Sequence, residues 1–350
     1  NLAVGGVANA INLDNEATLN MSKLYFVKEA LDEVQQFVEQ VYFPDVCAIG
    51  ALYADWLPYG AGVKNYLAVP DFPLDEKGTQ FDLPGGTIMN GDLGTVKEIK
   101  SFRDDYFKEG VTESIARAWY DGDWEKHPYD EETVPKYGKW EDDGKYSWVK
   151  APRFQGKPMQ VGPLAQVLVG LALKHEPTVR WGTKALETIG AVAKTKVGPE
   201  ILHSTLGRHA ARMIRTCVIA EITQKQWKLL VENIGKGDTE IFRKPEFPSG
   251  EQRGYGFHEA PRGTLSHWIV IRDGKIANYQ AGVPSTWNAG PRDAKGQVGP
   301  YEASLIGNPI ADAERPLEVL RTIHSFDPCL ACAIHTLDVE GNEIARVRTA

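Results

Sequence analysis

The sequence predicts a mainly α fold built around a bundle of long helices, with small β hairpins and long ordered loops. Residues 199–234 keep apolar side chains at helical spacing for about ten turns without an internal proline, as a long buried helix does. Residues 19–43 show the same spacing. Residues 268–280 place two β-rich runs around an Asp-Gly pair, a pattern typical of a hairpin. Helix is therefore expected to dominate.

The first element along the chain is an amphipathic helix over residues 19–43. Its apolar residues recur on one helix face: Leu24, Val27, Leu31, Val34, Phe37 and Val38. From there to about residue 100 the chain is rich in glycine, proline and aromatic residues, so irregular chain with short strands is expected. In residues 103–150 acids outnumber bases, which predicts a polar, surface-exposed excursion within one domain.

Helical spacing returns in the second half of the chain. Residues 160–175 and 199–234 are predicted helices, and residues 268–280 are the predicted hairpin. Residues 315–326 are predicted to form a short helix that ends just before a pair of cysteines. No internal repeat or low-complexity tract interrupts this order.

Composition excludes several classes of protein. The chain has 350 residues and a net charge of −8, which argues against a nucleic-acid partner. It holds no apolar run of 18 residues that would span a membrane. Its 4 cysteines are too few for a disulfide scaffold.

The C-terminal sequence DPCLACAIH is the candidate metal site. Cys329 and Cys332 stand three apart, with Asp327 and Pro328 before them and His335 after. The pair lacks the second close cysteine pair of a zinc ribbon, the adjacent histidine of a c-type haem and the strand that precedes a thioredoxin-like dithiol. A soft-metal site and an incidental structural pair stay open.

The other cysteines and histidines are interpreted as structural. Cys47 and Cys217 lie in apolar contexts that suit small core residues. The same interpretation applies to five histidines: His203, His209, His258, His267 and His324.

DPCLACAIH resembles the D-P-C-x-x-C-x-x-H motif at the end of the [NiFe]-hydrogenase large (catalytic) subunit. Further segments resemble that family in the same order along the whole chain: INLDNEATLNMSKLY, YFPDVCAIGALYADW, APRFQGKPMQVGPLAQ, HEAPRGTLSHW, VPSTWNAGPRDAKGQVGPYEASLIGNPI and LRTIHSFDPC. The resemblance implies a long-helix bundle of the [NiFe]-hydrogenase large-subunit type.

The resemblance also implies a set of metal ligands. The family holds nickel by four thiolates, two of which bridge to an iron that carries one CO and two cyanides. Cys329 is then a terminal nickel ligand and Cys332 bridges nickel and iron. His335 would bind a nearby magnesium through its imidazole, and the backbone carbonyl of Ala281 is a second expected magnesium contact.

Residues around the metals follow from the same resemblance. Arg262 and Ser285 are expected to donate hydrogen bonds to the cyanides, with Arg262 over the open face of the two metals. Asp327 is expected to hold the Arg262 guanidinium by a bidentate pair. The poorly accepting CO would lie against three apolar residues: Pro261, Leu265 and Pro284.

The implied reaction is heterolytic cleavage of dihydrogen into a hydride and a proton. A terminal thiolate or Arg262 is the candidate base. The electrons would leave through a small subunit that carries iron–sulfur clusters, because this chain has too few cysteines to hold such a relay.

Members of the family are made as precursors that an endopeptidase cuts after nickel-insertion factors have loaded the metal. The cut would fall between His335 and Thr336. Residues 1–335 would then form a single mature domain, and the propeptide 336–350 would be removed.

One family motif is missing. No R-x-C-G-x-C stands anywhere in this chain, and the chain begins at Asn1 instead of methionine. We therefore expect the N-terminal third or more of the subunit to be absent, and the chain alone to be inactive. Two alternative interpretations are a non-catalytic relative of the complex-I hydrogenase-like subunit and a Cys-x-x-Cys structural metal protein.

The expected location is periplasmic. The segments look most like respiratory uptake enzymes, whose small subunit carries a twin-arginine signal and takes the large subunit along. The resemblance thus implies membrane association through the partner.

Overall fold

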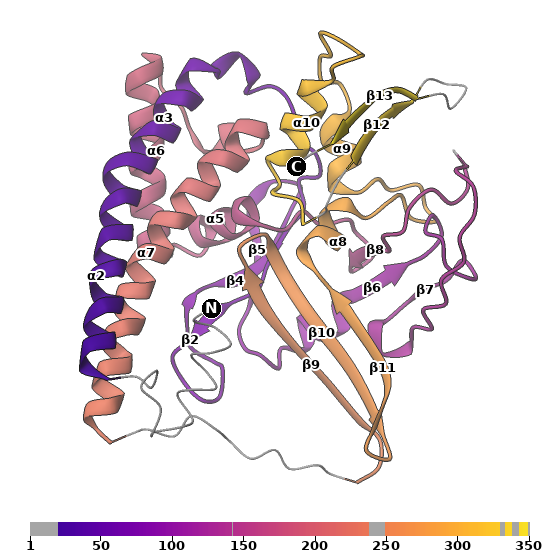
Figure 1. Ribbon diagram of the computed structural model, residues 1–350, viewed down its shortest axis with the longest axis horizontal. Helices are drawn as coiled ribbons and strands as arrows, with labels where there is room; N and C mark the ends of the chain where they lie inside the picture. Colours follow the sequence, from indigo (N-terminus) through magenta and orange to yellow (C-terminus); the bar gives the residue numbers. More distant parts are fainter. Residues whose placement is uncertain (1–19, 142, 238–248, 330–332, 338–342, 349–350) are drawn as a thin grey trace.

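The computed structural model describes residues 20–141, 143–237, 249–329, 333–337 and 343–348. The longest helices gather on one side of the molecule, and a long three-stranded sheet lies on the other (Figure 1). The predicted mainly α composition is not confirmed, because the chain is 43% helix and 22% strand. The missed strands are short, and their pairing joins residues that are distant in sequence, which local periodicity does not reveal.

The helical side begins where the amphipathic pattern predicts a helix. It comprises α2 (Met21–Phe37), the π-helical segment η1 (Val38–Tyr42) and α3 (Phe43–Leu52). The Asn20 side chain accepts a hydrogen bond from the backbone N–H of Lys23 and so caps α2. The short 3-10 helix η2 (Ala54–Trp56) ends this part of the chain.

Three more helices complete the bundle: α5 (Pro163–Ala172), α6 (Glu176–Ala193) and α7 (Thr205–Gly235). The 3-10 helix η4 (Pro199–Leu202) leads into α7, whose 31 residues confirm the long helix predicted for 199–234. Ser204 caps α7 by accepting from the N–H of Gly207. Buried apolar side chains from α3, α5, α6 and α7 form one core, so α7 is fixed along its first half.

Short strands fill the chain between the helices, as predicted for the stretch up to about residue 100. One sheet has the order β1 (Tyr66–Ala68), β4 (Gly85–Met89), β5 (Asp92–Ile99). A pair is formed by β2 (Asp71–Pro73) and β3 (Phe81–Leu83). A further sheet has the order β7 (Glu125–Lys126), β6 (Val111–Ser114), β8 (Ala151–Phe154), with α4 (Asp105–Gly110) and η3 (Pro128–Asp130) beside it.

The predicted hairpin is confirmed and extended. It consists of β10 (Gly263–Arg272) and β11 (Lys275–Gly282), and β9 (Gln252–Ala260) pairs with the other edge of β10. Asp273 and Gly274 both have positive φ, at 52° and 72°, as a two-residue hairpin turn requires. The opposite turn of the sheet, between β9 and β10, consists of Pro261 and Arg262.

The C-terminal part returns to the start of α7. It comprises α8 (Pro284–Ala289), α9 (Pro300–Leu305) and α10 (Leu317–His324), and α10 confirms the short helix predicted for 315–326. Strands β12 (Ala333–Leu337) and β13 (Glu343–Arg348) form an antiparallel pair.

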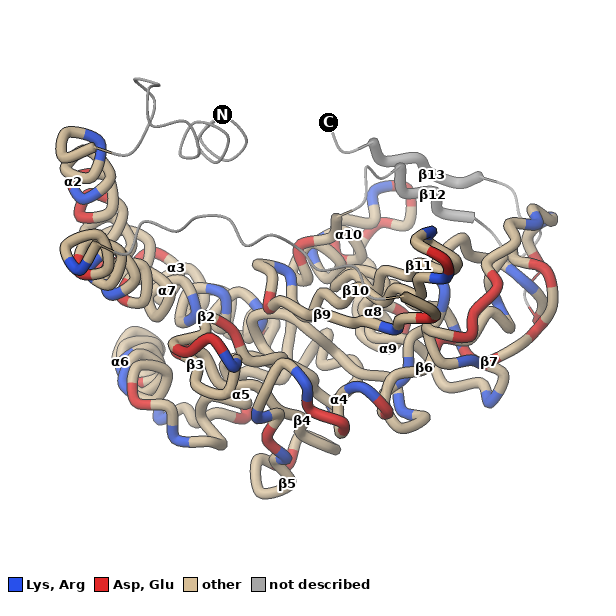
Figure 2. Tube along the Cα trace, turned by 90° about the horizontal axis from the view of Figure 1, so that it is seen from below, with Lys and Arg blue, Asp and Glu red and all other residues tan. Residues whose placement is uncertain are grey.

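Charged residues of both signs are interspersed over the fold (Figure 2). Within the residues that the structure describes, no helix is both long and apolar enough to cross a membrane.

The predicted excursion 103–150 contains a buried charge cluster. The Lys150 ammonium lies 2.8 Å from Glu113, contacts Glu131, and donates to Gln280 Oε1 at 3.0 Å. Burial, and next the Glu113 carboxylate, raise the pKa of Glu131 to about 9, against the opposing effect of Lys150. Glu131 therefore holds a proton in the fold at neutral pH.

This cluster predicts that stability falls with rising pH. A carboxyl whose pKa is raised by folding contributes stability that is complete below its unfolded pKa and is lost as pH rises through about 9. Glu131→Gln should make the free energy of unfolding decrease less steeply with pH. For one proton that decrease is at most about 1.4 kcal/mol per pH unit. Urea unfolding at pH 6 and pH 9 measures the change. The matched control is Glu98→Gln on the exposed side of β5, and an equal slope in both variants would contradict the assignment.

Candidate metal centre

The turn between β9 and β10 carries the predicted arginine. The Nε of Arg262 lies 3.2 Å from Asp327 Oδ1, and the two side chains are 38% and 41% exposed. The contact lacks the alignment of a hydrogen bond, because Arg262 Nε is buried without an acceptor among the described residues. The structure thus brings Arg262 and Asp327 together as an ion pair, without the two aligned hydrogen bonds of the expected bidentate pair.

Asp327 and Cys329 follow the end of α10. The backbone of Asp327 is left-handed, with φ at 58°, a conformation that aspartate tolerates better than most residues. This turn redirects the chain, and Pro328 then prevents the helix from continuing. The backbone N–H of Cys329 donates to Ser285 Oγ at 3.0 Å.

Ser285 lies near the start of α8 and is buried, as is Pro284. Because Ser285 accepts from Cys329, the hydroxyl proton of Ser285 is free to turn toward another acceptor. Cys329 itself is an exposed, free thiol. Four predicted residues therefore meet at one place: Arg262, Ser285, Asp327 and Cys329.

The remaining predicted residues are distributed around this place or lie elsewhere. Pro261 and Asp327 line one cavity of about 380 Å³. Leu265 is half-buried in β10 opposite His258, and Ala281 lies in β11 opposite His267. His335 and Thr336 both lie in β12, opposite Arg346 and Ala345. Cys332 lies outside the described residues.

Ionisable groups line the same cavity, and of these Arg215 and Glu259 are buried. Arg212 and Arg215 reach it from α7, and Glu259 and His258 from β9. Burial raises the pKa of Glu259 to about 7, with Arg215 opposing the rise. His258 Nδ1 lies 2.7 Å from Asp71 Oδ2. Burial also lowers the pKa of Arg212, against the attraction of Asp327.

Sequence reasoning missed Arg212 and Arg215. Both stand in LGRHAARMIRT, where basic residues recur within the apolar pattern of a predicted buried helix. A charged residue in such a pattern must find a partner when it is buried, and that was the available signal.

Cys47 and Cys217 are core residues, as predicted. Both are fully buried among apolar side chains. Burial raises the pKa of the Cys47 thiol to about 11 and that of Cys217 to about 12. Both thiols therefore stay protonated at neutral pH, and neither is suited to act as a thiolate ligand.

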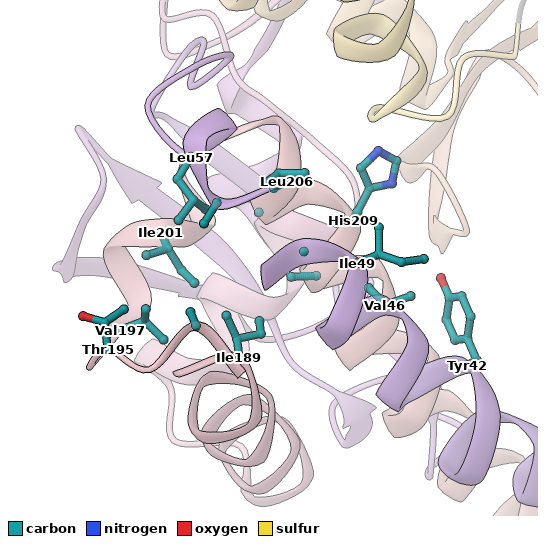
Figure 3. Close-up of a pocket in the computed structure, with 15 residues that line it drawn as sticks. Tyr42, Val46, Ile49, Leu57, Ile189, Thr195, Val197, Ile201, Leu206 and His209 are labelled. Carbon is teal, nitrogen blue, oxygen red and sulfur yellow. The ribbon is translucent and has the colours of Figure 1, made fainter. Parts of the chain in front are cut away.

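A second cavity, of about 340 Å³, lies between α3, α6 and the start of α7 (Figure 3). Its described lining is almost wholly apolar and includes Ile189, Ile201 and Leu206, with Ile49, His209 and Tyr42 at one side. This lining offers no thiol or carboxylate, so the cavity is not the candidate metal centre.

The residues present fit one side of a thiolate-bound metal centre. Cys329 supplies a soft donor, and the unpartnered Nε–H of Arg262 needs an acceptor that no described residue provides. Within the described ranges no group of three or more His, Cys, Asp or Glu side chains forms a complete ligand set. Further ligands must therefore join Cys329 for a metal to be held.

Known proteins with similar sequences share one description. Residues 1–335 match the family described as nickel-dependent hydrogenase. The chain is 51% identical over 353 residues to the Hydrogenase-2 large chain of Escherichia coli (strain K12), which covers 99% of this chain and 62% of that protein. It is 40% identical over 376 residues to the uptake hydrogenase large subunit of Bradyrhizobium diazoefficiens. That alignment covers 99% of this chain and 61% of the Bradyrhizobium protein.

Solved structures agree with the sequences. An H2-activated [NiFeSe]-hydrogenase from Dm. baculatum matches with a TM-score of 0.75 and 34% identity, over 91% of this chain and 61% of that one. The reduced Ni-Fe-Se hydrogenase from D. vulgaris Hildenborough matches with a TM-score of 0.71 and 31% identity. The match covers 89% of this chain and 61% of that one. The chain thus spans about 62% of the length of the first of these relatives.

Proposed function

The chain belongs to the nickel-dependent hydrogenase family, and on that premise we propose that it forms part of the catalytic large subunit of a [NiFe] hydrogenase. The reaction is the reversible conversion of H2 into two protons and two electrons. The observation that carries the proposal is the meeting of Cys329 with the Arg262–Asp327 ion pair and Ser285.

Cys329 and Cys332 would supply two of the four thiolates that hold nickel, with Cys332 also reaching iron. The other two would come from outside residues 1–350, because Cys47 and Cys217 are buried in the core. When bound, the nickel–iron centre with its CO and cyanide ligands supplies the heterolytic cleavage of dihydrogen.

Arg262 and Ser285 would orient the diatomic ligands. The buried Nε–H of Arg262 and the hydroxyl of Ser285 are donors, which suits cyanide nitrogens. Pro261, Leu265 and Pro284 would surround the CO ligand with apolar contacts and exclude water from it. Arg262, held in place by Asp327, would lie close to the open face of the site and is one candidate for the base that takes the proton. A terminal thiolate is the other candidate for the base.

We further propose a magnesium site and a maturation cut at the C-terminus. The His335 imidazole and the Ala281 carbonyl would bind magnesium. The match to the family ends at His335, in agreement with a cut between His335 and Thr336. That bond lies within β12, which pairs with β13, so the endopeptidase would need this hairpin to open.

An apolar surface on the helical side supports an iron–sulfur small subunit as partner. Phe26 is 61% exposed and Leu52 79% exposed, although both are large apolar residues. Other exposed apolar side chains of α2, η1 and α3 are Met21, Tyr25, Val34, Phe37, Val41 and Ile49. Uptake hydrogenase large subunits are among the relatives. This supports a periplasmic, membrane-linked enzyme that is exported with the small subunit by the twin-arginine route.

Metal analysis and activity test the proposal together. The intact large subunit should be produced with its small subunit, nickel-insertion factors and endopeptidase. Nickel and iron should be found in equal amounts in the large subunit after its separation from the iron–sulfur small subunit, and the complex should reduce a redox dye under hydrogen. Zinc alone would favour a structural metal protein. A protein fully loaded with nickel and iron that reduces no dye would defeat the proposed activity.

A further inference from the structure

Three arginines of α7 lie on one face of that helix. Arg208, Arg212 and Arg215 are spaced four and three residues apart, which aligns them along the helix axis. Arg208 is 2% exposed and Arg215 is 6% exposed. Burying a guanidinium is costly unless its N–H groups find acceptors, so their acceptors indicate what this row of arginines does.

The C-terminal member of the row holds the turn that carries Arg262. Arg215 donates through Nη2 to the Glu259 carbonyl at 2.8 Å. Through Nη1 it donates to the carbonyls of Ala260 at 3.0 Å and Pro261 at 3.2 Å. One planar group thus binds the three residues that directly precede Arg262 in the chain. The Glu259 carboxylate is 4.0 Å from Arg215, so the carbonyls are its closer acceptors.

The other two members hold the segment that carries Asp327. Arg212 Nη2 donates to the Ser325 carbonyl at 3.0 Å, and Arg208 Nε donates to Ser325 Oγ at 2.6 Å. The Arg208 guanidinium also lies over the ring of Phe326, 3.9 Å from its centroid. Ser325 and Phe326 directly precede Asp327.

Both members of the Arg262–Asp327 pair are therefore anchored to one rigid helix. Their segments come from different parts of the chain, and α7 binds the backbone of both: half-buried Arg212 binds the Ser325 carbonyl and buried Arg215 binds the Glu259 carbonyl. A helix turn has a fixed length, so the separation between Arg212 and Arg215 determines the separation of the two segments.

We propose that Arg208, Arg212 and Arg215 form a row that sets the position of Arg262 relative to Asp327, with Arg212 and Arg215 as positioning residues for catalysis. This inference rests on the proposed function, because it assigns the row a role in that same site. Lysine does not replace arginine in this role, since its compact ammonium lacks the planar fork that reaches the Glu259 carbonyl with one nitrogen and the Ala260 and Pro261 carbonyls with another.

The test uses the intact hydrogenase with Arg215→Lys and, separately, Arg212→Lys. The matched control is Arg153→Lys in β8. Arg153 is equally buried, binds the carbonyls of Pro152, Pro291 and Gln297, and is paired with Asp293. All three variants should lose thermal stability. Only the two α7 variants should lose turnover, by about 10- to 100-fold in kcat at unchanged nickel content, as small misplacements of reacting groups do.

Amide hydrogen exchange gives a readout that does not depend on activity. Exchange should accelerate in residues 259–264 of the Arg215→Lys variant and in residues 325–329 of the Arg212→Lys variant, but in neither segment of the control. Combining Arg215→Lys with Arg262→Lys should cost no more activity than Arg262→Lys alone, because both act through the same guanidinium.

Three outcomes would overturn the inference. The first is unchanged exchange in both segments, and the second is a kcat loss in Arg153→Lys equal to that of the α7 variants. The third is additive losses in the double variant. Failure of the proposed function is a separate result, since nickel-loaded wild-type enzyme would then reduce no dye while the exchange experiment still tests the role of the row.

Discussion

Replacing Cys329 by serine in the intact subunit should abolish nickel retention and hydrogen-dependent dye reduction. A serine hydroxyl is a hard, protonated group at neutral pH and is a poor ligand for a soft metal. Loss of a partner that only orients a metal ligand costs about 10- to 100-fold in affinity or activity, so loss of the ligand should exceed about 100-fold. Nickel content per subunit and dye reduction under hydrogen measure the two effects.

The control for this variant is Cys217→Ala. Cys217 is fully buried within α7 and its thiol has no role at the site. We expect this variant to lose about 1 kcal/mol of stability and to keep its nickel. Stoichiometric nickel in Cys329→Ser, or nickel loss of the same size in Cys217→Ala, would show that Cys329 is not a ligand.

Arg262→Lys should lower kcat by about 100- to 1000-fold with nickel still bound, the range seen when one oriented donor is removed from a site that develops charge. Lysine keeps the positive charge but lacks the planar donor set and the raised basicity of arginine. It would leave Asp327 with a differently placed partner. Since Arg262 is not a metal ligand in the proposal, nickel content should stay near the wild-type level.

Arg253→Lys is the matched control for this second substitution. Arg253 lies on β9, the strand that precedes the turn of Arg262, is half-exposed, and pairs with Glu251 and Asp130. Exposed ion pairs of this kind contribute little, so turnover should not change. An Arg262→Lys enzyme with wild-type kcat would remove Arg262 from the mechanism, and one that has lost its nickel would assign it to metal assembly.

The structure also relates Glu259, a buried acid that lines the cavity, to pH. Because burial raises the pKa of Glu259 to about 7, this carboxyl changes charge near neutral pH, within hydrogen-bonding distance of Val69 N–H and Thr264 Oγ1. The backbone carbonyl of Glu259 is one of the three carbonyls that Arg215 binds directly before Arg262. The position of Arg262 is thus linked to a group that titrates in the working range of most enzymes.

The sequence by itself determined the features that depend on neighbours along the chain. Helical periodicity predicted α2, α5, α7 and α10, and Asp273-Gly274 predicted the hairpin, because such signals arise within a few residues. The spacing of Cys329, Cys332 and His335 carried the resemblance to hydrogenases. Those assignments required no knowledge of the packing.

Only the tertiary structure decided the rest. The short strands form between distant segments, so the mainly α composition that local periodicity predicted is not confirmed. The contacts of Ser285 with Cys329, and of Arg215 with the turn before Arg262, join residues 44 or more positions apart. Such contacts are formed when buried polar groups find partners across the fold, and no local pattern in the sequence specifies which partner each will meet.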